Sequence, residues 1–300
     1  MKGMVTAPQP LAVEEGILVL KRGGNAVDAA ITTAFVQGVV TPQSCGIAGF
    51  GTMYIYMGGE HRFIDFHGTA PSKATPEMWK DIIISETRDG FGYILEGKVN
   101  DVGYQSIAVP GTLKGCFEAL SRYGTISWEG AIGPAIRYAE EGFPVSTNLW
   151  QSWGSHSLRG QASSVERLNA TDEARKIYFK ENGDLYGEGE IFTNKDMAGT
   201  LKRIAQEGPD LFYKGEMARQ MVADIESHGG FLTLEDLANY QVTVNQPLWG
   251  SYRGHKVATN QPPGGGITLL EILNILEEFD LASLGHNSPE YIRVVAEAMK

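Results

Sequence analysis

The sequence predicts a folded protein that mixes α-helices and β-strands in one large unit over residues 1–300. Its composition is that of a globular chain, because 42% of the 300 residues are hydrophobic and 20% are charged. Apolar residues recur at helical spacing in several long segments. Two short runs, at 52–57 and 61–66, are typical of a β-hairpin. Together these observations indicate an α/β protein, and the chain length suits a single large domain.

The first two predicted elements are helices. The first runs from Pro10 to Arg22, since proline suits an initial turn and the glycine pair that follows suits an end. Asn25 is a suitable N-cap for the second helix, with Asp28 three residues later as its capping-box partner. Apolar and small residues lie all round this second segment, so we expect it to be buried on nearly all sides.

The predicted hairpin lies between a glycine-rich loop, "TPQSCGIAGFG" (41–51), and the polar turn "HGTAP" (67–71). Its strands, "TMYIYM" and "HRFIDF", are joined by a pair of glycines. The second strand leads directly to His67 at the tip of the polar turn. His67 could contact a ligand as a donor or act as a general base. Taken by itself, the turn favours an ordinary exposed residue.

From Pro110 onward the pattern is mostly helical. Helices are predicted at 110–124, 127–142, 195–208, 210–230, 233–240, 267–279 and 288–300, and strands at 240–252 and 255–261. The last helix begins at a Ser288 cap, has an apolar face, and reaches Lys300 without a C-cap. We therefore expect the chain to be incomplete at its C-terminus.

Charge and targeting signals restrict the partners and the compartment. The net charge of −11 and the isoelectric point of about 5.1 argue against a nucleic-acid partner and against a polybasic membrane contact. The N-terminus lacks the apolar stretch of a signal peptide, and no segment has the roughly 20 apolar residues of a spanning helix. Two cysteines cannot form a disulfide framework. We expect a cytoplasmic protein, or a periplasmic one if a leader has been removed.

The six histidines give no metal-binding motif. The sequence has no HExxH pattern and no CxxC pair, and no spacing is typical of zinc. The sequence therefore predicts no metal site.

Two glycine-rich motifs each have a functional and a structural interpretation. "GIAGFG" (46–51) lies between a helix and a strand, whereas a dinucleotide fingerprint has the order GxGxxG between a strand and a helix. A tight turn with positive φ or close packing is favoured there over nucleotide binding. "PPGGGIT" (262–268) opens a helix and could hold an anion or line a substrate pocket. It lacks the lysine of a phosphate-binding loop, so a stiff helix entry beside a neighbouring strand is favoured.

The two cysteines, Cys45 and Cys116, are candidate nucleophiles by residue type alone. No histidine or lysine is adjacent to Cys45 in the sequence. Small, buried core cysteines are the favoured interpretation of both positions.

Taken in order, the motifs resemble the gamma-glutamyltranspeptidase family in its large-subunit region. The strongest stretch, residues 3–49, contains "GMVTAPQP", "GGNAVDAA" and "SCGIAG". Further matching segments are "DFHGTAPSKATPEMW", "AVPGTLKGCFEALSRYGTISWEGAIGPAIRYAEEGFPVS", "GPDLFYKGEMARQMVADIESHGGFLTLEDLANYQV" and "PPGGGITLLEILNILEEFDL". The resemblance covers essentially the whole chain.

The resemblance implies an α+β fold, the four-layer αββα sandwich of the N-terminal nucleophile (Ntn) hydrolases, of which this chain supplies the large-subunit part. It implies an autoprocessing zymogen, in which the new N-terminal threonine of the small subunit is the nucleophile and its α-amine is the base. No catalytic residue then lies in this chain, which alone is expected to be inactive. The expected partners are the small-subunit polypeptide of the same precursor and a small-molecule amide or peptide substrate, with no cofactor.

The sequence departs from the family motif at His67 and Gly68, where the family has Arg-Glu. The resemblance assigns that arginine to the α-carboxylate of the glutamyl group. A guanidinium is always charged and can bind a carboxylate with two hydrogen bonds, whereas histidine is mostly uncharged near neutral pH. Losing such a pair typically costs about 2–5 kcal/mol. His67 and Gly68 are the predicted substrate-binding residues, and we expect an amide or acyl substrate other than a standard γ-glutamyl peptide.

Two alternatives stay open. The protein could be a true γ-glutamyl hydrolase or transferase for glutathione-like substrates, with His67 or Arg62 replacing the missing guanidinium. It could also be a catalytically inactive binding homologue. Hydrolysis of a γ-glutamyl anilide separates the first alternative from the main hypothesis, and autoprocessing separates the second.

Overall fold

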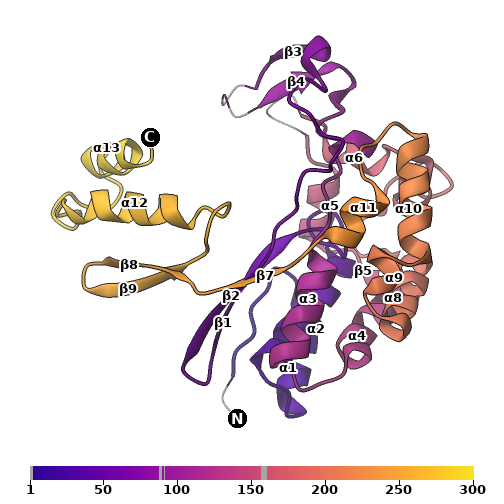
Figure 1. Ribbon diagram of the computed structural model, residues 1–300, viewed down its shortest axis with the longest axis horizontal. Helices are drawn as coiled ribbons and strands as arrows, with labels where there is room; N and C mark the ends of the chain where they lie inside the picture. The colour runs from indigo at the N-terminus through magenta and orange to yellow at the C-terminus, as the bar shows by residue number, and fades with distance from the viewer. Residues whose placement is uncertain (1–2, 88–89, 91, 157–160) are drawn as a thin grey trace. The chain divides into compact units, whose positions relative to one another are not determined.

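Figure 1 shows the computed structural model, which describes residues 3–87, 90, 92–156 and 161–300. Its backbone contacts divide the chain into two compact units. The first, here called the helical unit, comprises Met1–Phe50 and His67–Gln241. The second, here called the hairpin unit, comprises Gly51–Phe66 and Val242–Lys300. A single domain over residues 1–300 stays a prediction.

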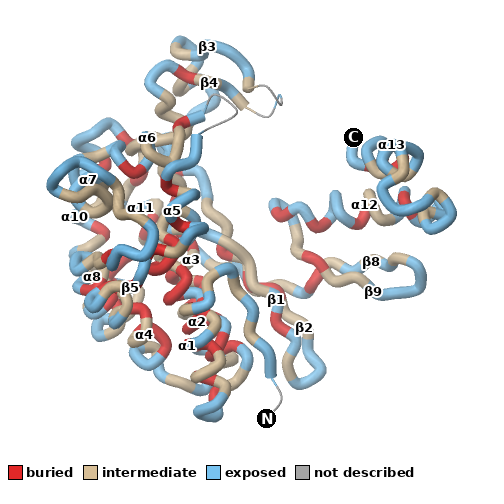
Figure 2. The backbone as a smooth tube through the Cα atoms, turned by 180° about the vertical axis from the view of Figure 1, so that it is seen from behind, coloured by how far each residue is buried: buried red, intermediate tan, exposed pale blue. Residues whose placement is uncertain are grey.

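Helix α2 is the centre of the helical unit. It spans Ala26–Val40, and eleven of its 15 residues are buried, which confirms the prediction of a helix buried on nearly all sides. Helices α1 (Pro10–Lys21), α3 (Thr112–Tyr123) and α4 (Trp128–Glu141) pack against it. Helix α8 (Lys195–Glu207) packs on the next layer, against α4. Figure 2 shows buried segments running through these helices.

The start of α2 is fixed by the predicted capping box. The Asn25 side chain accepts hydrogen bonds from the N–H groups of Val27 and Asp28, and the Asp28 carboxylate accepts from the Asn25 N–H at 2.8 Å. Asp28 is fully buried and also accepts from the N–H of Thr125 at 2.7 Å and of Ile126 at 3.3 Å. Burial by itself would raise the pKa of Asp28, but the hydrogen bonds from Thr125, Asn25 and Ile126 hold it below its ordinary value. One carboxylate thus caps α2 and ties it to the loop before α4.

An aromatic cluster closes the same core. Trp128, the first residue of α4, makes edge-to-face contacts with Phe35 and with Phe117, both at 5.2 Å between ring centroids. Its indole N–H donates to the carbonyl of Ile204 in α8 at 3.1 Å. The indole N–H thus has a hydrogen-bond partner in α8, while the ring packs α4 against α2 and α3.

The rest of the helical unit consists of short elements. They are β3 (Ile83–Glu86), β4 (Tyr93–Leu95), β5 (Phe143–Pro144), β6 (Ile191–Phe192), α5 (Thr147–Trp153), α6 (Ser164–Leu168), α7 (Asp172–Tyr178), α9 (Asp210–Tyr213), α10 (Glu216–Ser227), α11 (Leu234–Asn239) and three single-turn helices at 80–82, 96–98 and 104–106. Strands β3 and β4 pair with each other, as do β5 and β6. The predicted helical segment 210–230 contains two helices, α9 and α10, because the backbone of Gly215 between them is extended rather than helical.

The hairpin unit contains the predicted hairpin. Strands β1 (Gly51–Met57) and β2 (Glu60–Phe66) pair antiparallel, and β7 (Thr243–Asn245) adds to β2. The turn residues Gly58 and Gly59 both have positive φ, which favours glycine at these positions. The hairpin is therefore confirmed.

The remainder of the hairpin unit is a second hairpin with two helices. Strands β8 (Leu248–Tyr252) and β9 (His255–Thr259) pair with each other, and α12 (Gly266–Glu277) packs on β8. Helix α13 (Pro289–Ala298) begins at the predicted Ser288 cap and contributes Val294 and Ala298 to a small core with Leu276. The mixed content of helices and strands confirms the α+β class.

Candidate functional site

The turn that follows β2 holds both predicted site residues, and its backbone is fixed from two sides. The Val109 N–H donates to the Thr69 carbonyl at 2.9 Å, in an isolated antiparallel bridge. The Tyr240 hydroxyl donates to the His67 carbonyl, also at 2.9 Å. His67 and Gly68 are half-buried and Pro71 is buried. Segments far away in the sequence therefore set the path of this turn.

The His67 imidazole lies beside the phenyl ring of Phe50. The two rings are stacked, with centroids 6.4 Å apart and planes inclined by 30°. Phe50 is 62% exposed, so its ring is available at the surface next to the imidazole. A neutral imidazole offers one donor and one acceptor nitrogen. The pair can thus offer a ligand an apolar ring beside a hydrogen-bonding group.

Gly68 occupies a position with little room for a side chain. A Cβ there would lie 3.1 Å from Cδ1 of Phe50, 3.3 Å from Cβ of Ala108 and 3.4 Å from the Val109 carbonyl oxygen. Any larger residue at 68 would have to displace the Phe50 ring or this neighbouring backbone. The glycine therefore lets Phe50 approach the turn.

Helix α11 anchors the chain just beyond the turn. The Asp236 carboxylate accepts from the Ser72 N–H at 2.9 Å and also forms the capping box of α11 with Thr233. Burial by itself would raise the pKa of Asp236, but the hydrogen bonds from Thr233 and Ser72 lower it. One short segment, 234–240, thus holds the stretch 67–72 at both ends: Tyr240 bonds the backbone of His67, and Asp236 bonds the backbone of Ser72.

The loop "GIAGFG" has a structural role in this neighbourhood. The Gly49 carbonyl accepts from the N–H groups of Gly111 and Thr112, at 2.8 and 2.9 Å, and so satisfies the start of α3. A Cβ at Gly38 of α2 would lie 3.3 Å from the Cα of Gly46. No glycine of this loop has positive φ. Close packing therefore accounts for Gly49 and Gly51, where a Cβ would lie 3.3 Å from Oγ1 of Thr112 and 3.0 Å from the Phe66 ring, whereas a Cβ at Gly46 would meet no atom within 4 Å.

The second glycine motif, "PPGGGIT", leads into α12 beside β9. Gly265 is the N-cap of this helix. A Cβ at Gly264 would overlap the side chain of Asn260, and one at Gly266 would lie 2.2 Å from Oγ1 of Thr259 in β9. The favoured interpretation, a helix entry close to a neighbouring strand, agrees with this geometry.

The cysteine predictions have opposite outcomes. Cys116 is buried in α3 at 3% exposure, and burial raises the pKa of Cys116 to about 12, which confirms a core cysteine. The buried interpretation was wrong for Cys45, which is exposed because its loop follows the surface after α2. Partial burial of its thiol still raises the pKa of Cys45, so the structure gives it no activated thiolate.

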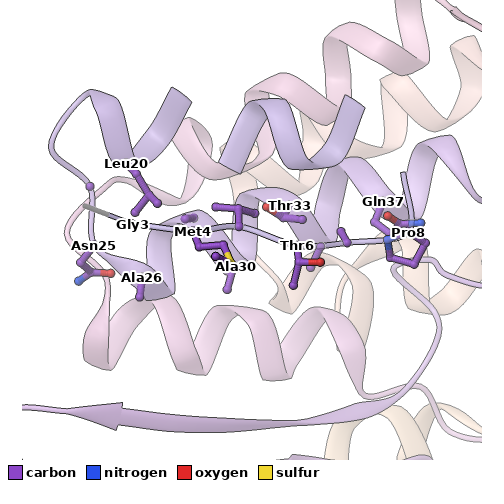
Figure 3. Close-up of a pocket in the computed structure, with 15 residues that line it drawn as sticks. Gly3, Met4, Thr6, Pro8, Leu20, Asn25, Ala26, Ala30, Thr33 and Gln37 are labelled. Atoms are coloured by element: carbon purple, nitrogen blue, oxygen red, sulfur yellow. The ribbon is translucent and has the colours of Figure 1, made fainter. Parts of the chain in front are cut away.

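A hollow of about 620 Å³ lies between the N-terminal segment and helices α1 and α2 (Figure 3). Met4, Thr6 and Pro8 lie along it (Figure 3). Its lining consists of Gly3–Pro8, Leu20, Gly24, Asn25, Ala26, Ala29, Ala30, Thr33, Ala34 and Gln37. None of these residues ionises, so this hollow has no group for acid–base chemistry.

Within the described ranges, no three His, Cys, Asp or Glu side chains come together as they would around a metal ion. The absence of a metal site stays a prediction. Of the helices that the structure describes, none is both long and apolar enough to cross a membrane.

Sequence reasoning did not identify Phe50 and Tyr240 as partners of His67. In the sequence, Phe50 belongs to a glycine-rich motif and Tyr240 ends a short predicted helix. The available signal was that Phe50 directly follows "GIAG" and that Tyr240 ends "DLANY", since both segments belong to the family resemblance. Neither segment indicates by itself that it contacts a turn so far along the chain.

Comparison with known proteins agrees with the resemblance. The family model described as gamma-glutamyltranspeptidase matches residues 12–300. The chain is 39% identical to a glutathione hydrolase proenzyme of Bacillus subtilis (strain 168) over 300 residues, covering 99% of this chain and 48% of the relative. It is 37% identical to the acylase ACY 1 proenzyme of Pseudomonas sp. (strain SE83), covering 100% of this chain and 52% of the relative. The chain thus spans about half the length of the curated relatives it matches.

A solved structure supports the same conclusion. The fold is similar to the crystal structure of Helicobacter pylori gamma-glutamyltranspeptidase, with a TM-score of 0.88 and 36% identity, covering 100% of this chain and 82% of that chain. The match extends through both the helical unit and the hairpin unit. The chain therefore belongs to the gamma-glutamyltranspeptidase family of Ntn hydrolases, in its large-subunit region.

Proposed function

We propose that this chain is the large-subunit part of an autoprocessing amide hydrolase or acyltransferase whose substrate is an amide or acyl compound other than a standard γ-glutamyl peptide. Relatives of similar identity are named both glutathione hydrolase and acylase proenzymes, so the family includes both kinds of enzyme. The N-terminal threonine of the small subunit would be the nucleophile and its own amine the base. This chain would supply substrate contacts and no catalytic residue, would need no cofactor, and would be inactive alone.

The setting of His67 is the observation that most supports this specificity. The position that the family motif gives to a carboxylate-binding arginine holds an imidazole beside the exposed Phe50 ring. The adjacent Gly68 packs too closely for the motif's glutamate to enter without a shift. An imidazole lacks the bidentate fork of a guanidinium, and beside an apolar ring it suits an uncharged acyl group better than an α-carboxylate. The missing ion pair corresponds to about 2–5 kcal/mol, or tens- to thousands-fold in affinity.

Arg62 is a poor replacement for the missing guanidinium. In β2 its Nη2 forms an ion pair with Glu60 at 2.8 Å, and its Nη1 donates to the His61 carbonyl at 2.8 Å. Releasing the guanidinium for a substrate would require breaking both contacts. The alternative of a true γ-glutamyl enzyme therefore favours His67 over Arg62 as the donor, and its main support is the similarity to glutathione hydrolase proenzymes.

The hairpin unit supports a polypeptide partner. Tyr56 in β1 and Trp249 in β8 are 64% and 45% exposed, and both contact the His61 imidazole, at 4.4 and 4.9 Å between ring centroids. Several exposed apolar residues follow in α12 and α13: Ile267, Leu269, Ile275 and Ile292. Exposed apolar surface of this kind is typical of a protein interface. We propose the small-subunit polypeptide of the same precursor as its occupant.

The first measurement is an intact-mass spectrum of the full-length precursor, purified without protease. Two chains, the smaller beginning at threonine, would support autoprocessing. A single uncut chain would contradict the proposal and favour the inactive binding homologue.

The substrate class is tested with two p-nitroanilides, γ-glutamyl and 4-aminobutyryl, which differ only in the α-carboxylate. Without an arginine for that carboxylate, we expect their kcat/KM values in the processed enzyme to agree within about tenfold. A preference for the γ-glutamyl compound above about a hundredfold would contradict the proposal and favour the true γ-glutamyl enzyme. His67→Arg should raise this preference at least about tenfold, because it restores a bidentate donor.

A further inference from the structure

We infer that Tyr240 is a positioning residue for His67: its hydroxyl holds the His67 carbonyl and thereby sets where the imidazole meets the substrate's acyl group. The inference deepens the proposed function and rests on it. It assigns to the substrate pocket a residue 173 positions away from His67 in the sequence.

The hydrogen bond between the two residues is direct and largely buried. The Tyr240 Oη donates to the His67 carbonyl oxygen at 2.9 Å, and Tyr240 is 6% exposed. The donor is a phenol on a short, stiff side chain, so its oxygen can move only if the ring moves. A backbone carbonyl held in this way fixes the peptide plane next to the His67 side chain.

A second tyrosine holds the Tyr240 ring in place. The ring stacks on that of Tyr213, with centroids 6.0 Å apart and planes inclined by 13°. Tyr213 is fully buried, and its own hydroxyl donates to the Pro110 carbonyl at 3.0 Å. The ring under Tyr240 is therefore fixed to the start of α3.

Lys114 of α3 holds the other end of Tyr240. Its ammonium donates to the Tyr240 carbonyl and lies 5.2 Å from the ring centre of Tyr213 and 5.9 Å from that of Tyr240. Such cation–π contacts stabilise both rings. Burial and the charge of Lys214 lower the pKa of Lys114, in keeping with an ammonium set among aromatic rings.

These contacts reach His67 from two sides. Phe50 lies beside its imidazole, and Tyr240 holds its carbonyl. A hydrogen bond to a ligand weakens steeply as its distance and angle depart from the ideal, so displacing a substrate-contacting group weakens binding. Removing only the hydroxyl should therefore loosen the turn and change substrate binding more than the chemical step.

The test is Tyr240→Phe in the full-length processed enzyme, assayed with the 4-aminobutyryl and γ-glutamyl p-nitroanilides. Phenylalanine keeps the ring contacts and removes the hydrogen bond. We expect KM to rise about threefold to tenfold, with kcat within about twofold. In the double variant His67→Ala/Tyr240→Phe, KM should equal that of His67→Ala alone, since Tyr240 acts through His67.

A matched control is Tyr138→Phe, which removes a half-buried phenol hydroxyl that bonds Glu15 at 3.5 Å in another part of the helical unit. Its KM should equal that of the unmodified enzyme. Additive effects of His67→Ala and Tyr240→Phe would overturn the inference, as would an unchanged KM in Tyr240→Phe when His67→Ala raises KM. An unchanged KM in His67→Ala itself would overturn the proposed role of His67 as well.

A second readout needs no turnover. In the full-length processed enzyme, the NMR resonance of the His67 imidazole is assigned by its loss in His67→Ala. We expect this resonance to shift in Tyr240→Phe and to stay in place in Tyr138→Phe. An unmoved resonance in Tyr240→Phe would overturn the inference even if neither p-nitroanilide is cleaved.

Discussion

The helical unit and the hairpin unit differ in the burial of charge: both expose large apolar side chains, but among the described residues only the helical unit buries carboxylates. The helical unit buries two carboxylates, Asp28 and Glu15, at 0% and 5% exposure, and gives each of them hydrogen-bond partners. The hairpin unit leaves Tyr56, Trp249 and Ile292 exposed at 64%, 45% and 55%. Buried charges are tolerated only where the surrounding chain supplies every partner.

This contrast indicates where each unit obtains its stability. The buried carboxylates depend on contacts within the helical unit, so substitutions there should change the free energy of unfolding. The exposed apolar side chains of the hairpin unit contribute little to folding and suit an interface. Substitutions there should change association instead.

The largest effect is expected for Asp28→Asn. The amide would place an N–H₂ group among N–H and hydroxyl donors that now point at a carboxylate, so we expect a loss of about 3 kcal/mol in the free energy of unfolding. Urea unfolding followed by circular dichroism measures it. Asp210→Asn is the matched control, because that carboxylate is 69% exposed and should change stability by less than about 1 kcal/mol. Equal losses in the two variants would contradict a special role for Asp28.

The next effect concerns the ion pair between α1 and α4. Arg137→Ala leaves the Glu15 carboxylate, which is 6% exposed, without its guanidinium. We expect a loss of about 2 kcal/mol, below the value for a fully buried pair because the Arg137 side chain is 46% exposed. Lys202→Ala breaks the exposed pair between Lys202 of α8 and Glu140 of α4, and should cost no more than about 0.5 kcal/mol. Indistinguishable urea midpoints would show that burial of Glu15 does not matter.

The pH dependence of the free energy of unfolding should also depend on Asp28. The pKa of Asp28 in the folded protein lies below its ordinary value of 3.8, despite burial, because of hydrogen bonds from Thr125, Asn25 and Ile126. The folded state then binds fewer protons than the unfolded state. This contribution is complete above about pH 4 and is lost as the pH falls through the folded-state pKa. The free energy of unfolding, measured from pH 6 down to pH 3, should fall less steeply in Asp28→Asn than in the unmodified protein. Parallel curves for the two proteins would refute the lowered pKa of Asp28.

The smallest effect on stability is expected for Tyr56→Ser with Trp249→Ser. Both side chains are exposed, so the free energy of unfolding should change by less than about 0.5 kcal/mol. Binding of the small-subunit polypeptide should weaken about tenfold by calorimetry, because exposed aromatic residues often dominate an interface. Lys256→Ser on β9, also exposed, should leave both quantities unchanged. A large loss of stability with unchanged binding would reverse the comparison of the two units.

Local signals in the sequence predicted much of the fold. The capping box needed only Asn25 and Asp28, three residues apart, and the hairpin needed its glycine pair. The elements between Phe143 and Phe192 were missed because each is too short to show a period of its own. Their core is instead long-range: Phe192 packs on the rings of Phe143, Trp153 and Tyr178.

Only two residues of the candidate site, those in the turn after β2, could be predicted from the sequence. The resemblance indicated His67 and Gly68, because the motif around them is continuous in sequence. The contacts that place them come from Phe50, Val109 and Tyr240, and no periodicity or spacing relates these positions to one another. Cys45 was predicted wrongly for a related reason, since composition does not show which side of a loop faces solvent.

The arrangement of tryptophans gives the molecule a built-in optical label. Trp249 is the single tryptophan of the hairpin unit, and it is 45% exposed, whereas Trp128 is half-buried against Phe35 and Phe117 in the helical unit. An indole in water emits at longer wavelength than one in an apolar core. Binding of a partner over Trp249 would therefore move its fluorescence emission to shorter wavelength. The emission of Trp128 would change only when the core of the helical unit unfolds. With Trp150, which is 47% exposed in the helical unit, replaced by phenylalanine, fluorescence could time association and unfolding separately in a single unlabelled sample.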